Sequence, residues 1–131
     1  MKRIISTKEA PKALATYSQA VEINGMLFIS GQIAIDPGTG KLMEGGITEQ
    51  TRQVMKNIGA ILKEAGYKFA DVIKTTCILS DINNYGAMNA VYGSIFYENA
   101  PARAAFAAAG LPMGALVEIE TIACRDVTRD A

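Results

Sequence analysis

Three charged side chains stand in an otherwise mostly apolar stretch near the end of the sequence. In APARAAFAAAGLPMGALVEIETIA, residues 100–123, the basic residue is Arg103 and the acids are Glu118 and Glu120. A charged side chain in apolar surroundings costs free energy unless it is paired. These residues therefore either reach solvent at strand ends or form a site together.

An arginine and a glutamate on neighbouring strands have two interpretations. The structural one is a cross-strand salt bridge at a sheet edge, which the pattern alone favours because such pairs are usually structural. The chemical one is a pocket for a small carboxylate, since a guanidinium binds a carboxylate through two parallel hydrogen bonds. A glutamate kept ionised beside that cation could then position or deprotonate a water molecule.

Histidine is absent from the sequence. Its absence excludes Ser-His-Asp and Cys-His nucleophile pairs and removes the commonest zinc ligand. Cys77 and Cys124 lack C-x-x-C spacing, which is typical of small buried side chains rather than of a disulfide or a metal site. We expect no metal, and chemistry based on carboxylate, guanidinium, hydroxyl, thiol or backbone groups.

The charge balance argues against a polyanionic partner. Of the 131 residues, 13 are basic and 13 acidic, and neither sign clusters, so nucleic acid is not an expected partner. The first residues, MKRIISTKEAPK, have no apolar run after their basic start, and the uncharged tract 104–117 is too short to span a bilayer. We predict a single domain over residues 1–131 that is cytoplasmic and has no membrane partner.

The elements that must position these charges follow from the hydrophobic pattern. Residues 2–7 (KRIIST) are a candidate for a short first strand, and Asn24-Gly25 between two apolar runs predicts a hairpin with a type I′ turn. Residues 36–41 (DPGTGK) are a plain turn, because they lack the spacing of a phosphate-binding loop. Apolar residues spaced by about 3.6 predict a helix from Ile47 to Ala65 that ends at Gly66.

In the second half of the chain, the residue pattern predicts one more helix and three strands. Residues 71–81 read as a strand with Thr75, Cys77 and Leu79 on one face, and a helix follows from Tyr85 to Asn99. Its apolar stripe comprises Met88, Val91, Tyr92, Ile95 and Phe96. Two last strands lie around residues 103–107 and 117–125; if they pair, Arg103 and a carboxylate share a site.

This order of elements predicts an α+β fold. We expect a two-layer sandwich with two helices on one face of a mostly antiparallel sheet. The strands carry few charges on either face, so the face without helices should also be buried, against copies of the same chain.

Four segments resemble the Rid (YjgF-type) family. PARAAF with LPMGALVEIE is similar to its signature, and ATYSQAV, ISGQI and IKTTCILSDIN followed by MNAVY agree with it in the same order. The resemblance covers nearly the whole chain and is closest to the RidA subgroup, which comprises imine and enamine deaminases.

The resemblance implies a chorismate-mutase-like fold assembled as a homotrimer, with active sites in the clefts between subunits. Family members hydrolyse 2-iminopropanoate and 2-iminobutanoate, which arise from pyridoxal-phosphate-dependent dehydratases, to 2-oxo acids and ammonia without any cofactor. Arg103 is then expected to bind the substrate carboxylate and Glu118 to orient the attacking water. The cleft wall, contributed partly by the neighbouring subunit, is expected to contain Tyr17, Ser30, Gly31 and Asn89.

Each wall residue also has a structural interpretation. Tyr17 is then a half-buried packing aromatic, Ser30-Gly31 a strand end, and Asn89 a helix-surface amide.

Two positions depart from the family pattern. The family often has Cys two residues after the arginine; Ala105 stands there, so only its backbone could contact the substrate. The common Gly-Pro-Tyr near the start is replaced by Ala15-Thr16-Tyr17, which affects how the tyrosine ring is placed.

Two other functions remain as alternatives. One is RNA cleavage, ascribed to some relatives of this family, and the other is a non-catalytic ligand-binding or chaperone-like trimer. Neutral charge and the absence of histidine argue against the first, because phosphate contacts need cations. The presence of both Arg103 and Glu118 argues against the second.

Overall fold

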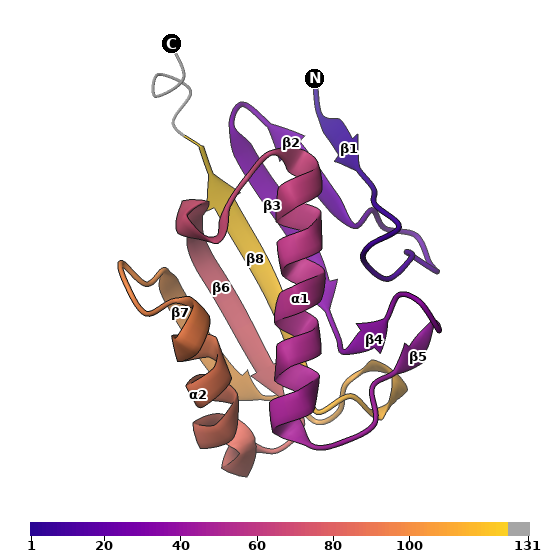
Figure 1. Cartoon of the computed structure of the whole chain (residues 1–131), viewed down its shortest axis with the longest axis vertical. Coiled ribbons are helices and arrows are strands. Elements are labelled where there is room, and N and C mark those ends of the chain that lie inside the picture. Colours follow the sequence, from indigo (N-terminus) through magenta and orange to yellow (C-terminus); the bar gives the residue numbers. More distant parts are fainter. Residues whose placement is uncertain (126–131) are drawn as a thin grey trace.

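A six-stranded sheet carries both helices on one face (Figure 1). The computed structural model describes residues 1–125, and the strands of this sheet lie in the order β1-β2-β3-β8-β6-β7. All neighbours are antiparallel except β6 and β7. The predicted α+β arrangement is confirmed. The strands are β1 (Arg3–Ile5), β2 (Ala20–Ile23), β3 (Met26–Gln32), β6 (Val72–Leu79), β7 (Ala102–Ala107) and β8 (Val117–Cys124).

The predicted hairpin joins β2 to β3. Its two central residues, Asn24 and Gly25, have φ of 50° and 77°, as a type I′ turn requires. The predicted turn at 36–41 is also present, and it joins two short strands that the sequence did not predict. These are β4 (Ile35–Asp36) and β5 (Lys41–Leu42), which form a separate two-stranded sheet.

Helix α1 (Ile47–Ala65) has the predicted bounds. It ends because Gly66 adopts a left-handed conformation, φ 85°, and its N–H group bonds back to the last turn. The predicted apolar face is buried: Val54, Ile58, Ile61 and Leu62 are at most 1% exposed. Within residues 1–125, neither helix is long and apolar enough to cross a membrane.

Helix α1 also buries amide side chains that hold two other segments. The Asn57 Nδ2 donates to the carbonyl oxygens of Ile33 (3.3 Å) and Ile35 (2.9 Å), just after β3. The Gln50 Oε1 accepts from the N–H group of Leu116 (3.0 Å), just before β8. The ends of β3 and β8 are therefore fixed to α1 at the place where the site residues stand.

Helix α2 (Tyr85–Ile95) is shorter than predicted. The expected end at Asn99 is wrong, because Phe96 leaves the helical conformation and packs inward against Tyr92 and Phe69, with ring centroids 4.8 Å and 5.8 Å apart. The apolar stripe is otherwise as predicted, and Met88 and Tyr92 are buried.

The last two strands do not pair, so the condition under which Arg103 and a carboxylate would share a site is not met. Strand β7 pairs in parallel with β6, where Arg103 lies beside Thr75, and β8 pairs with the other side of β6, where Thr75 lies beside Thr121. A helix between two strands allows the chain to cross over and add the second strand in parallel. Strand β6 therefore lies between Arg103 and the acidic strand.

The sheet face without helices, called here the open face, is partly apolar. On this face lie Ile4 of β1, Phe28 of β3 and Phe106 of β7, which are 53%, 44% and 47% exposed. Their neighbours in sequence, such as Ile5 and Leu27, are buried under the helices. Residues 1–125 leave these three side chains about half exposed, which agrees with the sequence-based expectation of a second apolar face.

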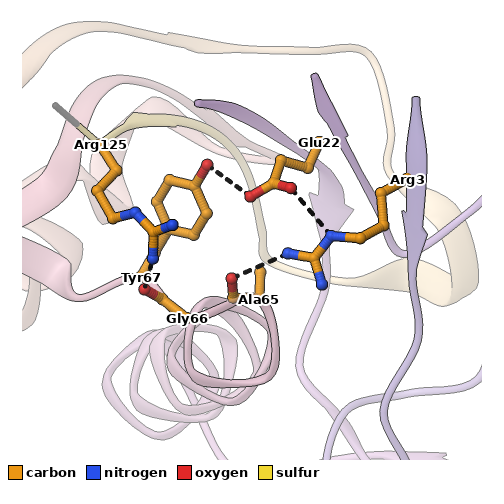
Figure 2. A network of polar contacts seen from close by, with 6 residues as sticks. All are labelled: Arg3, Glu22, Ala65, Gly66, Tyr67 and Arg125. Carbon is orange, nitrogen blue, oxygen red and sulfur yellow. Dashed lines mark hydrogen bonds and ion pairs between the residues drawn. The ribbon is translucent and has the colours of Figure 1, made fainter. Parts of the chain in front are cut away.

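A polar network closes the C-terminal end of α1 (Figure 2). The Glu22 carboxylate accepts hydrogen bonds from the Arg3 Nε (2.9 Å) and from the Tyr67 hydroxyl (2.8 Å). The hydrogen bond from Arg3 lowers the pKa of Glu22, and burial raises the pKa of Tyr67 to about 12. Because the pKa of Glu22 is lowered by folding, its contribution to stability is lost as pH falls through that lowered value.

The same network binds the last carbonyl groups of the helix. The Arg3 guanidinium donates to the Ala65 carbonyl (3.2 Å), and the Arg125 guanidinium donates to the Gly66 carbonyl (3.1 Å). Cations at a helix C-terminus are favourable because the carbonyl groups there carry partial negative charge. The first and last described segments are thus both attached to α1.

Candidate active site

A cavity of about 500 Å³ opens where the end of β3 meets the start of β8. Four of the predicted site residues line it: Tyr17, Ser30, Gly31 and Glu118. Most of the remaining wall is apolar and comes from segments next to these strands, including Leu14, Ile33, Ile35, Pro112 and Met113. The structure thus brings the predicted acid Glu118 and three of the predicted wall residues together in a mainly apolar hollow, which Glu120 also lines.

Glu118 is the partly buried acid of this cavity. Alternation along β8 buries Val117 and Ile119 under the helices and places Glu118 and Glu120 on the open face, with Glu120 exposed. Burial, and secondarily the charge of Glu120, raise the pKa of Glu118. A carboxylate with raised proton affinity is a better general base near neutral pH than an ordinary glutamate.

Gly31 leaves the space that the Glu118 side chain occupies. The register of β3 against β8 shifts between Ile29 and Gln32, and Gly31 lies in that irregularity. A Cβ atom at position 31 would overlap with Oε2 of Glu118. The absence of a side chain at 31 is therefore what allows the carboxylate to lie against β3.

This contact makes Gly31→Ala a probe of carboxylate position. The φ of Gly31 lies outside the left-handed region, and the atom displaced is the end of a flexible side chain, so we expect the melting temperature to change by only a few degrees. Turnover of the imino acids proposed below should fall by roughly 10-fold or more, because a misplaced catalytic group costs rate steeply. Unchanged turnover would show that catalysis does not require the Glu118 carboxylate to lie where it does against β3. Gly86→Ala, where a Cβ meets open space, is the matched control.

Ser30 and the loop before β2 are joined by hydrogen bonds. The Ser30 hydroxyl donates to the Ser18 carbonyl (2.7 Å), so its proton is engaged and its oxygen is left as an acceptor. Gln19 is 4% exposed, and its Nε2 donates to the carbonyls of Thr7 (3.0 Å) and Pro11 (2.9 Å). These bonds fix the loop that brings Tyr17, itself 51% exposed, to the cavity.

The other predicted residues form a second cluster around Arg103. Its Nη1 donates to the Asn89 Oδ1 (2.7 Å), its Nη2 donates to the Tyr85 hydroxyl, and its Cζ lies 4.8 Å from the ring centre of Tyr92. Ala105 follows two residues later on the same face of β7 and packs against the core. Arg103 is thus oriented by α2 rather than by an acid.

The two clusters lie on opposite faces of the sheet. Arg103 faces α2, whereas Glu118 lies on the open face, and β6 separates their strands. The predicted salt bridge is therefore wrong: among residues 1–125, the ion pair found joins Arg3 to Glu22. The expectation that paired strands would let one chain bring Arg103 and Glu118 into one site is wrong for the same reason.

Sequence reasoning missed Tyr85 as a partner of Arg103 and treated Tyr92 as an apolar residue only. A signal was available, because Tyr85, Asn89 and Tyr92 are spaced i, i+4 and i+7 and so share one face of a helix. The sequence did not indicate which strand packs against this face of the helix.

Comparison with known proteins identifies the family. Residues 7–125 match the family described as Endoribonuclease L-PSP. The chain belongs to this family. Proteins similar to it include those of rat and human, each named 2-iminobutanoate/2-iminopropanoate deaminase. Both are 48% identical to it over 123 residues, 94% of this chain and 90% of theirs.

Solved structures of L-PSP relatives have the same fold. A putative endoribonuclease from Thermotoga maritima is 44% identical, with a TM-score of 0.94 over 96% of this chain and 99% of its own. A Yersinia pestis protein described as of unknown function in the conserved Rid family is 47% identical, with a TM-score of 0.91 over 95% and 100%. The resemblance to the Rid family is confirmed.

Proposed function

We propose that this L-PSP family protein hydrolyses 2-imino acids, with 2-iminopropanoate and 2-iminobutanoate as substrates, to 2-oxo acids and ammonia. The observation that carries the proposal is Glu118, a partly buried carboxylate with a raised pKa in a mainly apolar cavity. The deaminase names of relatives 48% identical over 94% of the chain support the same reaction.

The proposed reaction depends mainly on positioning the substrate and a water molecule, and less on a strong acid or base. A protonated imine is already electrophilic at C2, and Glu118 orients a water molecule and accepts its proton as the oxygen attacks. Glu118 then passes this proton to the amino nitrogen of the carbinolamine. The C–N bond breaks to release ammonia, and the carbinolamine hydroxyl loses its proton to solvent, which leaves the 2-oxo acid and regenerates the carboxylate. Arg103 binds the substrate carboxylate and fixes C2 in front of the water, a contribution of orientation and electrostatics.

The same proposal includes a homotrimer with the site between subunits. Glu118 and Arg103 lie on opposite faces of one sheet, so a single chain leaves each without the other. We propose that Tyr17, Ser30, Gly31 and Glu118 of one subunit face Asn89, Arg103 and Ala105 of the next. The exposed apolar side chains of the open face support burial of that face against copies of the chain.

The chemistry of the cavity favours imine hydrolysis over RNA cleavage. Its charged wall residues are two acids, Glu118 and Glu120, and a single cation, Lys12. Two carboxylates would repel an RNA phosphate, whereas they suit a protonated imine and the ammonia that leaves it.

A coupled assay tests the activity. A threonine dehydratase generates 2-iminobutanoate in the presence of semicarbazide, which competes for the imine and gives an absorbing product. The purified protein should lower the rate of semicarbazone formation in proportion to its concentration, while 2-oxobutanoate and ammonia still accumulate. Semicarbazone formation that is unaffected by the protein would rule the proposed activity out.

The assembly is tested by sedimentation. We expect the protein to sediment as a trimer at micromolar concentration, and Phe106→Lys to shift it toward monomer because a charge would be buried in the contact. Ile82→Lys, at a residue 54% exposed that lies before α2, is the control and should remain trimeric. A wild-type monomer would exclude both the trimer and the site between subunits.

A further inference from the structure

One face of α2 is built to hold a guanidinium. Tyr85, Asn89 and Tyr92 occupy positions i, i+4 and i+7 of the helix, and all three contact Arg103. The Arg103 Cζ lies 5.4 Å from the Tyr85 ring centre and 4.8 Å from that of Tyr92. Tyr92 is itself fixed by a 2.7 Å hydrogen bond between its hydroxyl and that of Thr75.

These contacts leave the guanidinium able to bind a ligand. Asn89 and Tyr85 each accept one hydrogen bond, from Nη1 and Nη2 respectively. A guanidinium carries more N–H groups than these two contacts use. Because no carboxylate of residues 1–125 lies in ion-pair contact with Arg103, its charge is available to an acid from outside this part of the chain.

The Tyr85 hydroxyl adds a second donor beside that charge. A phenol oxygen that accepts a hydrogen bond still has its own proton to donate. Tyr85 is partly exposed, and among residues 1–125 no acceptor for this proton is found. Since hydrogen bonds in a chain polarise one another, donation from the arginine strengthens the tyrosine as a donor.

We propose that Tyr85 is a further substrate-binding residue, which donates its hydroxyl proton to the carboxylate that Arg103 binds. This inference rests on the proposed function, in which Arg103 holds the carboxylate of the imino acid. The carboxylate then receives hydrogen bonds from guanidinium N–H groups and from the phenol O–H. Tyr92 is a positioning residue in this arrangement, since its ring lies under the guanidinium.

The test compares Tyr85→Phe with the wild-type protein. Calorimetric titration with 2-oxobutanoate, the stable product, should give a Kd raised roughly 10- to 100-fold, as loss of one hydrogen bond to a charged group implies. KM for 2-iminobutanoate should rise similarly while kcat changes little, because this contact holds substrate and transition state alike. Tyr97→Phe, which removes a hydroxyl from a side chain 81% exposed, is the matched control and should change neither constant.

A second ligand identifies the group that Tyr85 recognises. The wild type should bind 2-oxobutanamide, which has no carboxylate, more weakly than 2-oxobutanoate, and Tyr85→Phe should hardly change the Kd for the amide. An unchanged Kd for 2-oxobutanoate in Tyr85→Phe would overturn the proposal, and so would equal weakening for both ligands. Wild-type protein that binds 2-oxobutanoate through Tyr85 but does not hydrolyse imines would refute the proposed function and leave this inference standing.

Discussion

Replacement of Glu118 by glutamine is expected to lower kcat for imine hydrolysis by about 10²- to 10⁴-fold, the usual contribution of a general base. The amide has nearly the same shape but cannot accept a proton from water. Because the carboxylate is partly buried and its pKa is raised, the neutral amide should leave stability unchanged or slightly higher. The measurements are steady-state kinetics in the coupled assay, sedimentation and thermal unfolding.

Glu120→Gln is the matched control for this replacement. Glu120 lies two residues away on the same face but is exposed, and its charge contributes to the raised pKa of Glu118. Removing that charge should preserve turnover and shift the acid limb of the pH profile to lower pH, since Glu118 must be ionised to act. Loss of activity in Glu120→Gln with normal activity in Glu118→Gln would show that the wrong acid has been assigned.

Arg103→Lys should lower kcat/KM by roughly 10- to 100-fold although the positive charge remains. Lysine is a point charge on a flexible stem and loses the second of two parallel hydrogen bonds to a carboxylate. It also gives up contacts with Asn89 and Tyr85, so we expect a loss of about 1 kcal/mol in stability, or a few degrees in melting temperature.

Kinetics and melting must be measured on the same sample. Arg52→Lys, at an exposed position of α1, controls for the chemistry of the substitution and should be silent in both measurements. Normal hydrolysis by Arg103→Lys would indicate that Arg103 has only a structural role. A large fall in melting temperature that accounts for the lost activity would do the same.

The sequence predicted the elements whose signals are local. Asn24-Gly25 predicted the hairpin because a type I′ turn requires positive φ at both residues. The spacing of the apolar residues, together with Gly66, predicted the bounds of α1. The alternation that separates Glu118 from Val117 was also predicted, because it depends only on the period of a strand.

What the sequence did not predict depends on which strands become neighbours. Strand β7 could have paired with β8, which follows it, and nothing in the alternation of Ala and Phe indicates that β6 lies between them. The contact between Tyr85 and Arg103 follows from this topology, because α2 meets Arg103 only when β7 joins the sheet beside β6. Likewise, the end of α2 was misplaced because an inward turn of Phe96 depends on packing with Phe69.

The separation of Arg103 from Glu118 by one sheet has a genetic consequence in the proposed trimer. A subunit damaged at Glu118 still lends an intact Arg103 to its neighbour, and a subunit damaged at Arg103 still lends an intact Glu118. Cells that carry one allele of each kind therefore assemble mixed trimers in which some clefts receive both intact residues. Two alleles that are each inactive alone thus complement one another. An allele that carries both changes supplies neither residue, so combining it with either single-change allele yields no cleft that has both Glu118 and Arg103.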